Sequence, residues 1–186
     1  MFVKKSKKGE FGAIMSIIPI AIVLPVCVMM LCLYIAQSIK ENVQDALTLS
    51  CLAGALIDTK EYAETNNIVV ETPVKTYQYF QEYMKKNLSL AGDMSPKNEN
   101  SFITGPIIVK DFIVYSKYDD KFYVSDVLHE SAESQQWKDG RIVTNPSSPD
   151  GKNVTKTSVY ANIEFPMRTM FGIEITAHIH ELIAIE

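Results

Sequence analysis

The chain has 186 residues, of which 47% are hydrophobic, and its formal net charge is −4. Four lysines and one glutamate lie in the first ten residues, and the remainder carries 14 basic against 21 acidic residues, a formal −7 that disfavours a nucleic-acid partner. Three cysteines do not make a disulfide framework, and the length allows one modest domain rather than a large enzyme.

The dominant feature is an uncharged, apolar run of 26 residues from 11 to 36. As a helix with a rise of 1.5 Å per residue it would reach about 39 Å, which crosses a hydrocarbon core of about 30 Å with some tilt. The basic leader before it, residues 1–10 (MFVKKSKKGE), would stay in the cytoplasm. We therefore predict a single-pass protein of the cytoplasmic membrane, with its N-terminus inside and its C-terminal domain outside. A cleaved secretory signal is the alternative, but its apolar region is normally only about 7–15 residues long.

The same helix is expected to continue as an amphipathic extension over residues 37–57, giving an unbroken helix of about 45 residues. Apolar or small residues recur there at alternating spacings of four and three, which places them on one face of a helix. The predicted helix interface consists of Ile35, Ile39, Ala46, Leu49, Ala53 and Leu56, with Asn42 in the same stripe. This stripe needs a surface to bury against, which we expect the following domain to supply.

Residues 58–186 are predicted to form an extracytoplasmic α+β domain. Residues 58–71 are polar, with a short helical or extended piece, and Thr72-Pro73 then indicates an N-cap followed by proline at the first helical position. A second short helix with Tyr77, Phe80 and Met84 on one side would follow and end before Gly92.

The second half of the domain is predicted to be an antiparallel sheet. β-branched and aromatic residues from 107 onward flank Tyr118-Asp119-Asp120, which indicates a hairpin. The polar stretch 131–157 is expected to be a surface excursion, and residues 158–165 and 173–185 to be two closing strands. In the last strand, one face is predicted to lie on the core and the other in water. The predicted core face holds Ile173, Ile175, Ala177, Ile179, Ile183 and Ile185, and the wet face holds Glu174, Thr176, His178 and His180.

The N-terminal third resembles a known family. The basic leader, the proline-containing apolar span and the segment QSIKENVQDALTLSCLAGALID are similar to the TadE/TadG-like minor pseudopilins of tight-adherence (Tad, Flp-type) pilus systems. The family's helix is rich in Gln/Asn, Asp and Ala and ends in an Ala-Gly-Ala-like step, here Gln44, Asp45 and Ala46, then Ala53-Gly54-Ala55. The last two strands also resemble that family's ending. The resemblance implies a pilin-like fold in a bacterial envelope protein that assembles, primes or joins a pilus.

The resemblance also implies a processing site in the leader. Prepilin-type leaders usually have Gly before the cut and Glu at the fifth position after it. Gly9 and Glu10 are the candidate residues here, but the fifth position after Gly9 is Ile14. The alternative is that Glu10 simply ends the cytoplasmic leader.

The sequence predicts no enzyme, no cofactor and no metal. His178-x-His180 is the strongest candidate for a metal site, because both side chains point the same way on a strand, with Glu174 or His129 as a possible third ligand. Two polar residues on the wet face of the last strand are the favoured explanation of the pair, and no HExxH, CxxC, GxSxG or phosphate-binding glycine loop occurs.

The first hypothesis is therefore a non-enzymatic pilus-assembly protein that contacts membrane lipid and other pilins through its N-terminal helix, as part of a hetero-oligomer. The alternatives are a membrane-anchored binding or sensor domain unrelated to pili and, with less support, a membrane-tethered metallohydrolase using the two histidines.

Overall fold

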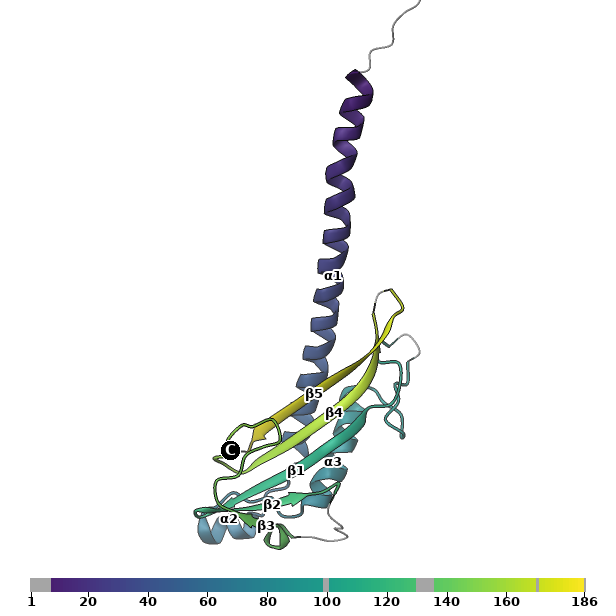
Figure 1. Ribbon diagram of the computed structural model, residues 1–186. Coiled ribbons are helices and arrows are strands. Elements are labelled where there is room, and N and C mark those ends of the chain that lie inside the picture. The colour runs from purple at the N-terminus through teal and green to yellow at the C-terminus, as the bar shows by residue number, and fades with distance from the viewer. Residues whose placement is uncertain (1–7, 99–100, 130–135, 170, 186) are drawn as a thin grey trace, which may run out of the picture. The chain divides into compact units, whose positions relative to one another are not determined.

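One long helix organises the chain. The computed structural model describes residues 8–98, 101–129, 136–169 and 171–185, with side chains from residue 21 onward. The chain divides into two compact units, Met1–Ile39 and Lys40–Glu186. Helix α1 (Lys8–Gly54) is continuous over 47 residues and belongs to both (Figure 1). The predicted unbroken helix is confirmed, although it ends at Gly54 rather than at residue 57.

The second unit contains one antiparallel sheet, so the α+β prediction is confirmed. Five strands lie in the order β3-β2-β1-β4-β5 (Figure 1). Their bounds are β1 (Ile108–Tyr118), β2 (Lys121–Asp126), β3 (Arg141–Val143), β4 (Ser158–Arg168) and β5 (Glu174–Ala184). β1 and β2 form the predicted hairpin, and Asp119 takes a left-handed φ of 52° in its turn. The strand β3 was not predicted from the sequence.

Two further helices precede the sheet. α2 (Thr59–Thr65) begins at Asp58, whose side chain accepts hydrogen bonds from the Lys60 and Glu61 backbone. α3 (Pro73–Asn87) begins with the predicted proline, although the Thr72 side chain makes no capping hydrogen bond.

Helix α3 packs against the inner face of the sheet. Its Phe80 and Met84 are buried, and the rings of Phe80 and Tyr77 lie 4.9 and 5.0 Å from the ring of Phe112 on β1. The predicted apolar face of the second helix is therefore the one that meets the sheet.

The part of α1 within the domain buries a different face from the predicted one. Its buried residues are Val43, Ala46, Leu47, Ser50, Cys51 and Gly54. Of the predicted interface, only Ala46 is buried, while Leu49 is 58% exposed.

The face of α1 that is buried is set by its last residue, Gly54. A Cβ on Gly54 would lie 2.9 Å from the backbone of both Thr76 and Phe80, so the Gly54 face is the one that can approach α3 closely. Ser50, Leu47 and Val43 share that face at helical spacing, whereas Leu49 and Ala53 do not.

Residues 136–157 pack against both faces of the sheet, which corrects the prediction of a surface excursion. Trp137, in the short helix η1 (Trp137–Asp139), is only 3% exposed and contacts the rings of Tyr118 and Tyr123, which lie on the inner face with Phe112. Val154 packs with Tyr115 and Tyr160 in a second apolar cluster. Residues 136–157 thus cover apolar side chains on both faces of the sheet. Residues 131–135 lie outside the described residues.

Strand β5 agrees with its predicted alternation over only part of its length. His178 and His180 are exposed as predicted, and Ile179, Ile183 and Ile185 are buried. Contrary to prediction, Ile173 and Ile175 are exposed. The apolar face of β5 therefore continues beyond the part of the sheet that the rest of the domain covers.

Candidate functional site

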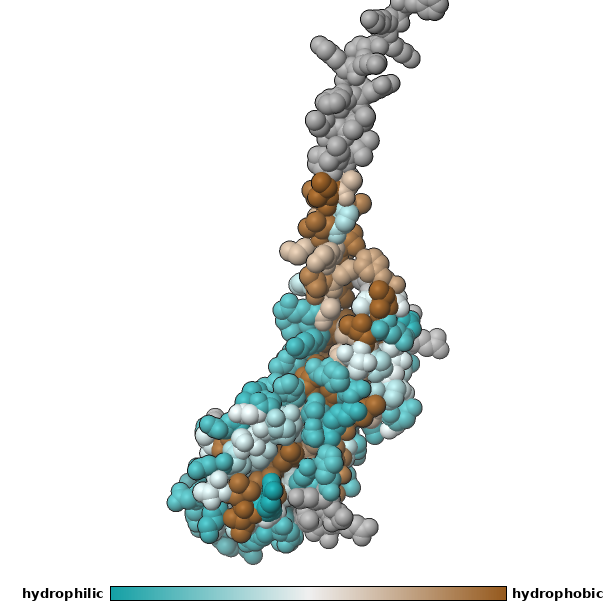
Figure 2. Space-filling view, viewed as in Figure 1, coloured by the Kyte–Doolittle hydropathy of each residue, from teal (hydrophilic) through white to brown (hydrophobic). Residues whose placement is uncertain are grey.

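The apolar segment of α1 exposes most of its side chains; Val28, Cys32, Ile35 and Ala36, on one face, are only partly exposed. Among residues 21–36, nine large apolar side chains are between 49% and 72% exposed. They are Ile22, Val23, Leu24, Val26, Met29, Met30, Leu31, Leu33 and Tyr34. The described part of α1, Ala21–Gly54, is long and apolar enough to cross a membrane. Figure 2 shows the beginning of this part, next to the grey residues, as mostly brown and tan surface. Such a surface requires lipid or other apolar helices around it.

A narrower apolar surface remains on α1 within the domain. Leu49 and Leu52 are 58% and 45% exposed, and Ala53 beside them is also exposed. This group, Leu49, Leu52 and Ala53, contains two residues of the predicted helix interface. As a contact with the chain's own sheet that prediction is wrong, but the residues are available to another protein.

The rest of the predicted interface is intermediate. Ile35, Ile39 and Leu56 are half-buried. The leader candidates Gly9 and Glu10 lie in the first turn of α1, and the structure does not describe their side chains.

The domain holds α1 through polar contacts as well as apolar ones. The Gln44 amide donates a hydrogen bond of 2.9 Å to the Glu181 carboxylate on β5. The Asn87 amide, at the end of α3, donates one of 3.1 Å to the buried Ser50 hydroxyl. These two contacts fix α1 between β5 and α3.

The two histidines of the metal hypothesis do not share a third ligand. His178 lies 3.8 Å from a carboxylate oxygen of Glu164, and His180 lies 3.9 Å from one of Asp150. The suggested third ligands are engaged elsewhere, because Glu174 pairs with Arg168 and His129 with Asp126. Among the described residues, no group of three or more His, Cys, Asp or Glu side chains is placed to hold a metal ion.

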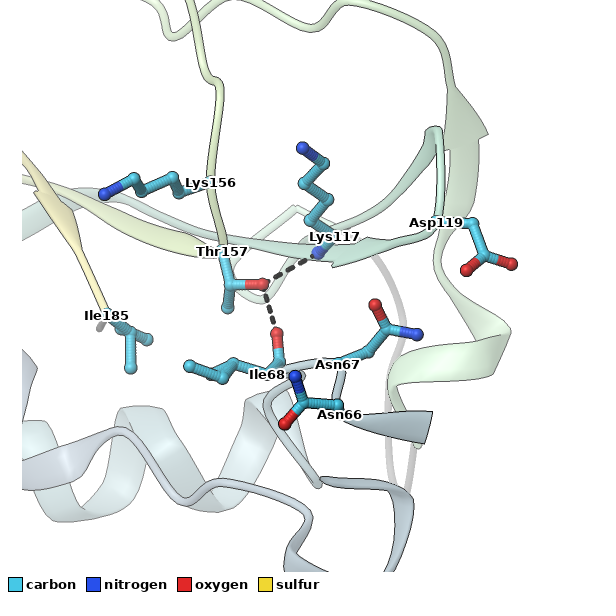
Figure 3. Close-up of a pocket in the computed structure, with 8 residues that line it drawn as sticks. All are labelled: Asn66, Asn67, Ile68, Lys117, Asp119, Lys156, Thr157 and Ile185. Carbon is cyan, nitrogen blue, oxygen red and sulfur yellow. Dashed lines mark hydrogen bonds between the residues drawn. The ribbon is translucent and has the colours of Figure 1, made fainter. Parts of the chain in front are cut away.

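A surface pocket of about 510 Å³ lies beside the end of the sheet that contains Ile185 (Figure 3). The hydroxyl of Thr157 accepts a hydrogen bond of 2.9 Å from the Lys117 backbone N–H and donates one to the Ile68 carbonyl. Figure 3 shows the side chains of Lys156 and Asp119 extending in different directions. The central polar group thus ties segments together, and the charged groups around it do not converge on one point.

A second pocket, of about 670 Å³, lies on the outer face of the sheet. Its lining includes His129, whose Nδ1 is 2.9 Å from Asp126, and this hydrogen bond raises the pKa of His129. Burial raises the pKa of Tyr115 in the same wall to about 12, so its phenol is not poised to act as a base.

Asp150 stands next to this pocket. Burial raises the pKa of its carboxyl group, but hydrogen bonds from Ser148 and Lys152 outweigh that effect and lower the pKa. The carboxylate is held by these partners, which is typical of a group that fastens a loop.

No protein-family model, curated protein or solved structure matches this chain. The surface of α1 is therefore the candidate functional site, on the strength of its own chemistry. The sequence identified its apolar span, whereas the orientation of its domain part depends on Gly54, whose tight packing no local pattern indicates.

Proposed function

We propose that this protein is a membrane-anchored subunit or assembly factor of a Tad/Flp-type pilus. Its N-terminus lies in the cytoplasm, its domain lies outside, and it acts through contacts of α1 and the domain with other pilus proteins rather than by catalysis. The observation that carries the proposal is that two parts of one continuous helix differ in the burial of their side chains. Its C-terminal part is packed in the domain, while most of the apolar side chains of residues 21–36 are exposed.

The physical argument rests on what can surround such a helix. A surface that suits lipid tails also suits neighbouring apolar helices, because both are equally apolar. A subunit of this kind can pass from the bilayer into a helical bundle without exposing its apolar side chains to water. Small residues in the span, Gly12, Ala13, Ser16 and Ala21, permit close approach between helices. The exposed Leu49, Leu52 and Ala53 would extend the contact beyond the membrane.

The test is a deletion in the native host with two complementing chains. Deletion should abolish surface pili, and the full chain should restore them. A chain whose residues 11–36 are replaced by an unrelated spanning segment should stay in the membrane but fail to restore pili, because helix contacts are lost while the anchor is kept. Normal piliation in the deletion strain would refute the proposal.

The mature N-terminus decides between the two forms of this proposal. Intact mass and N-terminal sequencing of the protein from host membranes would show a start at Glu10 if a prepilin-type peptidase cuts after Gly9. That result favours a processed pilus subunit. A start at Met1 favours an assembly factor that remains in the membrane.

A second candidate function is an anchored binding domain with no link to pili, which the two surface pockets favour. Its occupant would meet mainly polar and charged side chains, such as Lys117 and Asp119 in one pocket and Arg141 and His129 in the other. This alternative predicts normal piliation in the deletion strain, so the same experiment separates the two.

A further inference from the structure

An apolar patch occupies the turn between β4 and β5. Phe171, Ile173 and Ile175 are 68%, 60% and 44% exposed, and Phe102 on the adjoining segment is 46% exposed. Phe102 is joined to this turn because its carbonyl accepts a hydrogen bond of 2.7 Å from the Arg168 N–H. Figure 2 shows brown surface at this turn.

Backbone hydrogen bonds and an ion pair close the turn. Thr169 donates a backbone hydrogen bond of 2.9 Å to Ile173, and Gly172 takes the left-handed φ of 76° that closes the turn. Its charged residues, Arg168 and Glu174, form an ion pair of 3.1 Å, so residues 166–176 carry no net charge. The exposed apolar groups therefore lie on a hydrogen-bonded hairpin end that carries no net charge.

Contacts inside the domain show where the β4-β5 turn lies relative to the part of α1 within the domain. At the opposite end of β5, Ile185 bonds to Thr157, and Thr157 bonds to Ile68. The segment that contains Ile68 follows the C-terminal end of α1, since Ile57 pairs with Val70.

Further along β5, Glu181 meets Gln44, which lies ten residues before the end of α1. Moving from Ile185 to Glu181 along β5 thus corresponds to moving toward the N-terminal part of α1. The β4-β5 turn lies farther in that direction, toward the Lys40 end of the part of α1 that belongs to the domain (Figure 1).

The chain itself brings the bilayer to this end of the domain. The apolar run ends at Ala36, and the first charged residue after it is Lys40, which already belongs to the domain. The helix rises only ~6 Å between these two residues. If α1 spans the membrane, the headgroups therefore lie close to Lys40, and the patch lies toward the same end of the domain.

We propose that the patch Phe102, Phe171, Ile173 and Ile175 inserts into the outer surface of the bilayer that α1 crosses, as a second membrane contact. This inference rests on the proposed membrane anchoring. An apolar face of this kind inserts ~5–10 Å into the boundary between headgroups and acyl chains. The contact holds the domain on the membrane surface by two points, and the subunit must release the second one before it can leave the bilayer.

The test uses tryptophan fluorescence of the full chain in phosphatidylethanolamine–phosphatidylglycerol vesicles that contain brominated phosphatidylcholine, which quenches indole on contact. Four single variants are compared, and the wild-type signal from the buried Trp137 is subtracted. Phe171→Trp and Ile173→Trp report on the patch, Leu24→Trp reports on the span, and Ile142→Trp on β3, 57% exposed, is the matched surface control.

We expect Phe171→Trp and Ile173→Trp to be quenched more by bromines near the headgroups than by bromines near the chain ends, with emission shifted to the blue. Leu24→Trp should be quenched and Ile142→Trp should not. If Leu24→Trp is quenched while both patch variants behave like Ile142→Trp, the membrane contact of the patch is refuted and the membrane anchor is supported. If Leu24→Trp is not quenched either, the membrane contact and the membrane anchor are both refuted. A blue shift without quenching would mean that protein covers the patch, which also overturns the inference.

Discussion

Replacing Gly54 by alanine should destabilise the domain, although alanine is the better helix former. The new Cβ would lie 2.9 Å from the Phe80 nitrogen and the Thr76 carbonyl oxygen, and 3.3 Å from the Phe80 Cα. All three are backbone atoms of α3, which cannot turn aside as a side chain can. Overpacking of this kind costs ~1–3 kcal/mol, while the gain in helix propensity is at most ~1 kcal/mol and smaller at a helix end. We expect a net loss of about 1–2 kcal/mol.

The assay is thermal unfolding of the full chain in detergent micelles, followed by the fluorescence of Trp137. The expected loss corresponds to a fall in Tm of ~2–8 °C for a domain of this size. Gly92→Ala is the matched control, because a Cβ there meets nothing within 4 Å and should leave Tm unchanged or raise it slightly. If Gly54→Ala is as stable as Gly92→Ala, the proposed packing of α1 on α3 is refuted.

Two further predictions concern charged groups on the outer face. The pKa of His129 should lie above its ordinary value and should fall toward ~6.5 in Asp126→Asn, as measured by NMR titration. Because the folded-state pKa is raised, the pair stabilises the fold below pH ~6.5, and this stabilisation is lost as the pH rises through the folded-state pKa. An Asp119→Asn variant should leave that titration unchanged. Ser148→Ala should lower the free energy of unfolding, measured in urea at pH 7, by ~1–3 kcal/mol, because the Asp150 carboxylate loses a hydrogen bond. This loss should shrink as the pH falls through the lowered pKa of Asp150. A loss that does not change with pH would contradict the role of the Asp150 carboxylate.

Much of the fold could be predicted because its signals are local. The apolar run, the proline after Thr72 and the β-branched residues around Asp119 each specify an element from a few neighbouring residues. The rotation of α1 could not be predicted in this way. It depends on the close approach of Gly54 to Phe80, which are far apart in the sequence.

The cover that residues 136–157 give to the sheet was missed for a related reason. Residues 136–157 are mostly polar, and their few apolar members, such as Trp137 and Val154, show no periodicity. They are buried because the sheet presents apolar side chains on both faces, which becomes visible only once the strands are paired. Likewise, Ile173 and Ile175 follow the alternation of a buried strand, but nothing in the sequence shows where the cover of β5 ends.

The central claim is that the free surface of α1 contacts other subunits of a pilus, and site-specific photo-crosslinking in the native host tests it most directly. A photoreactive residue is placed at Leu49, which is 58% exposed on α1, and at Ile142, which is 57% exposed on β3 and serves as the control. The account predicts that Leu49, and not Ile142, crosslinks to another single-span protein of the same pilus system. Crosslinks to no protein at Leu49, or the same products at both positions, would contradict it.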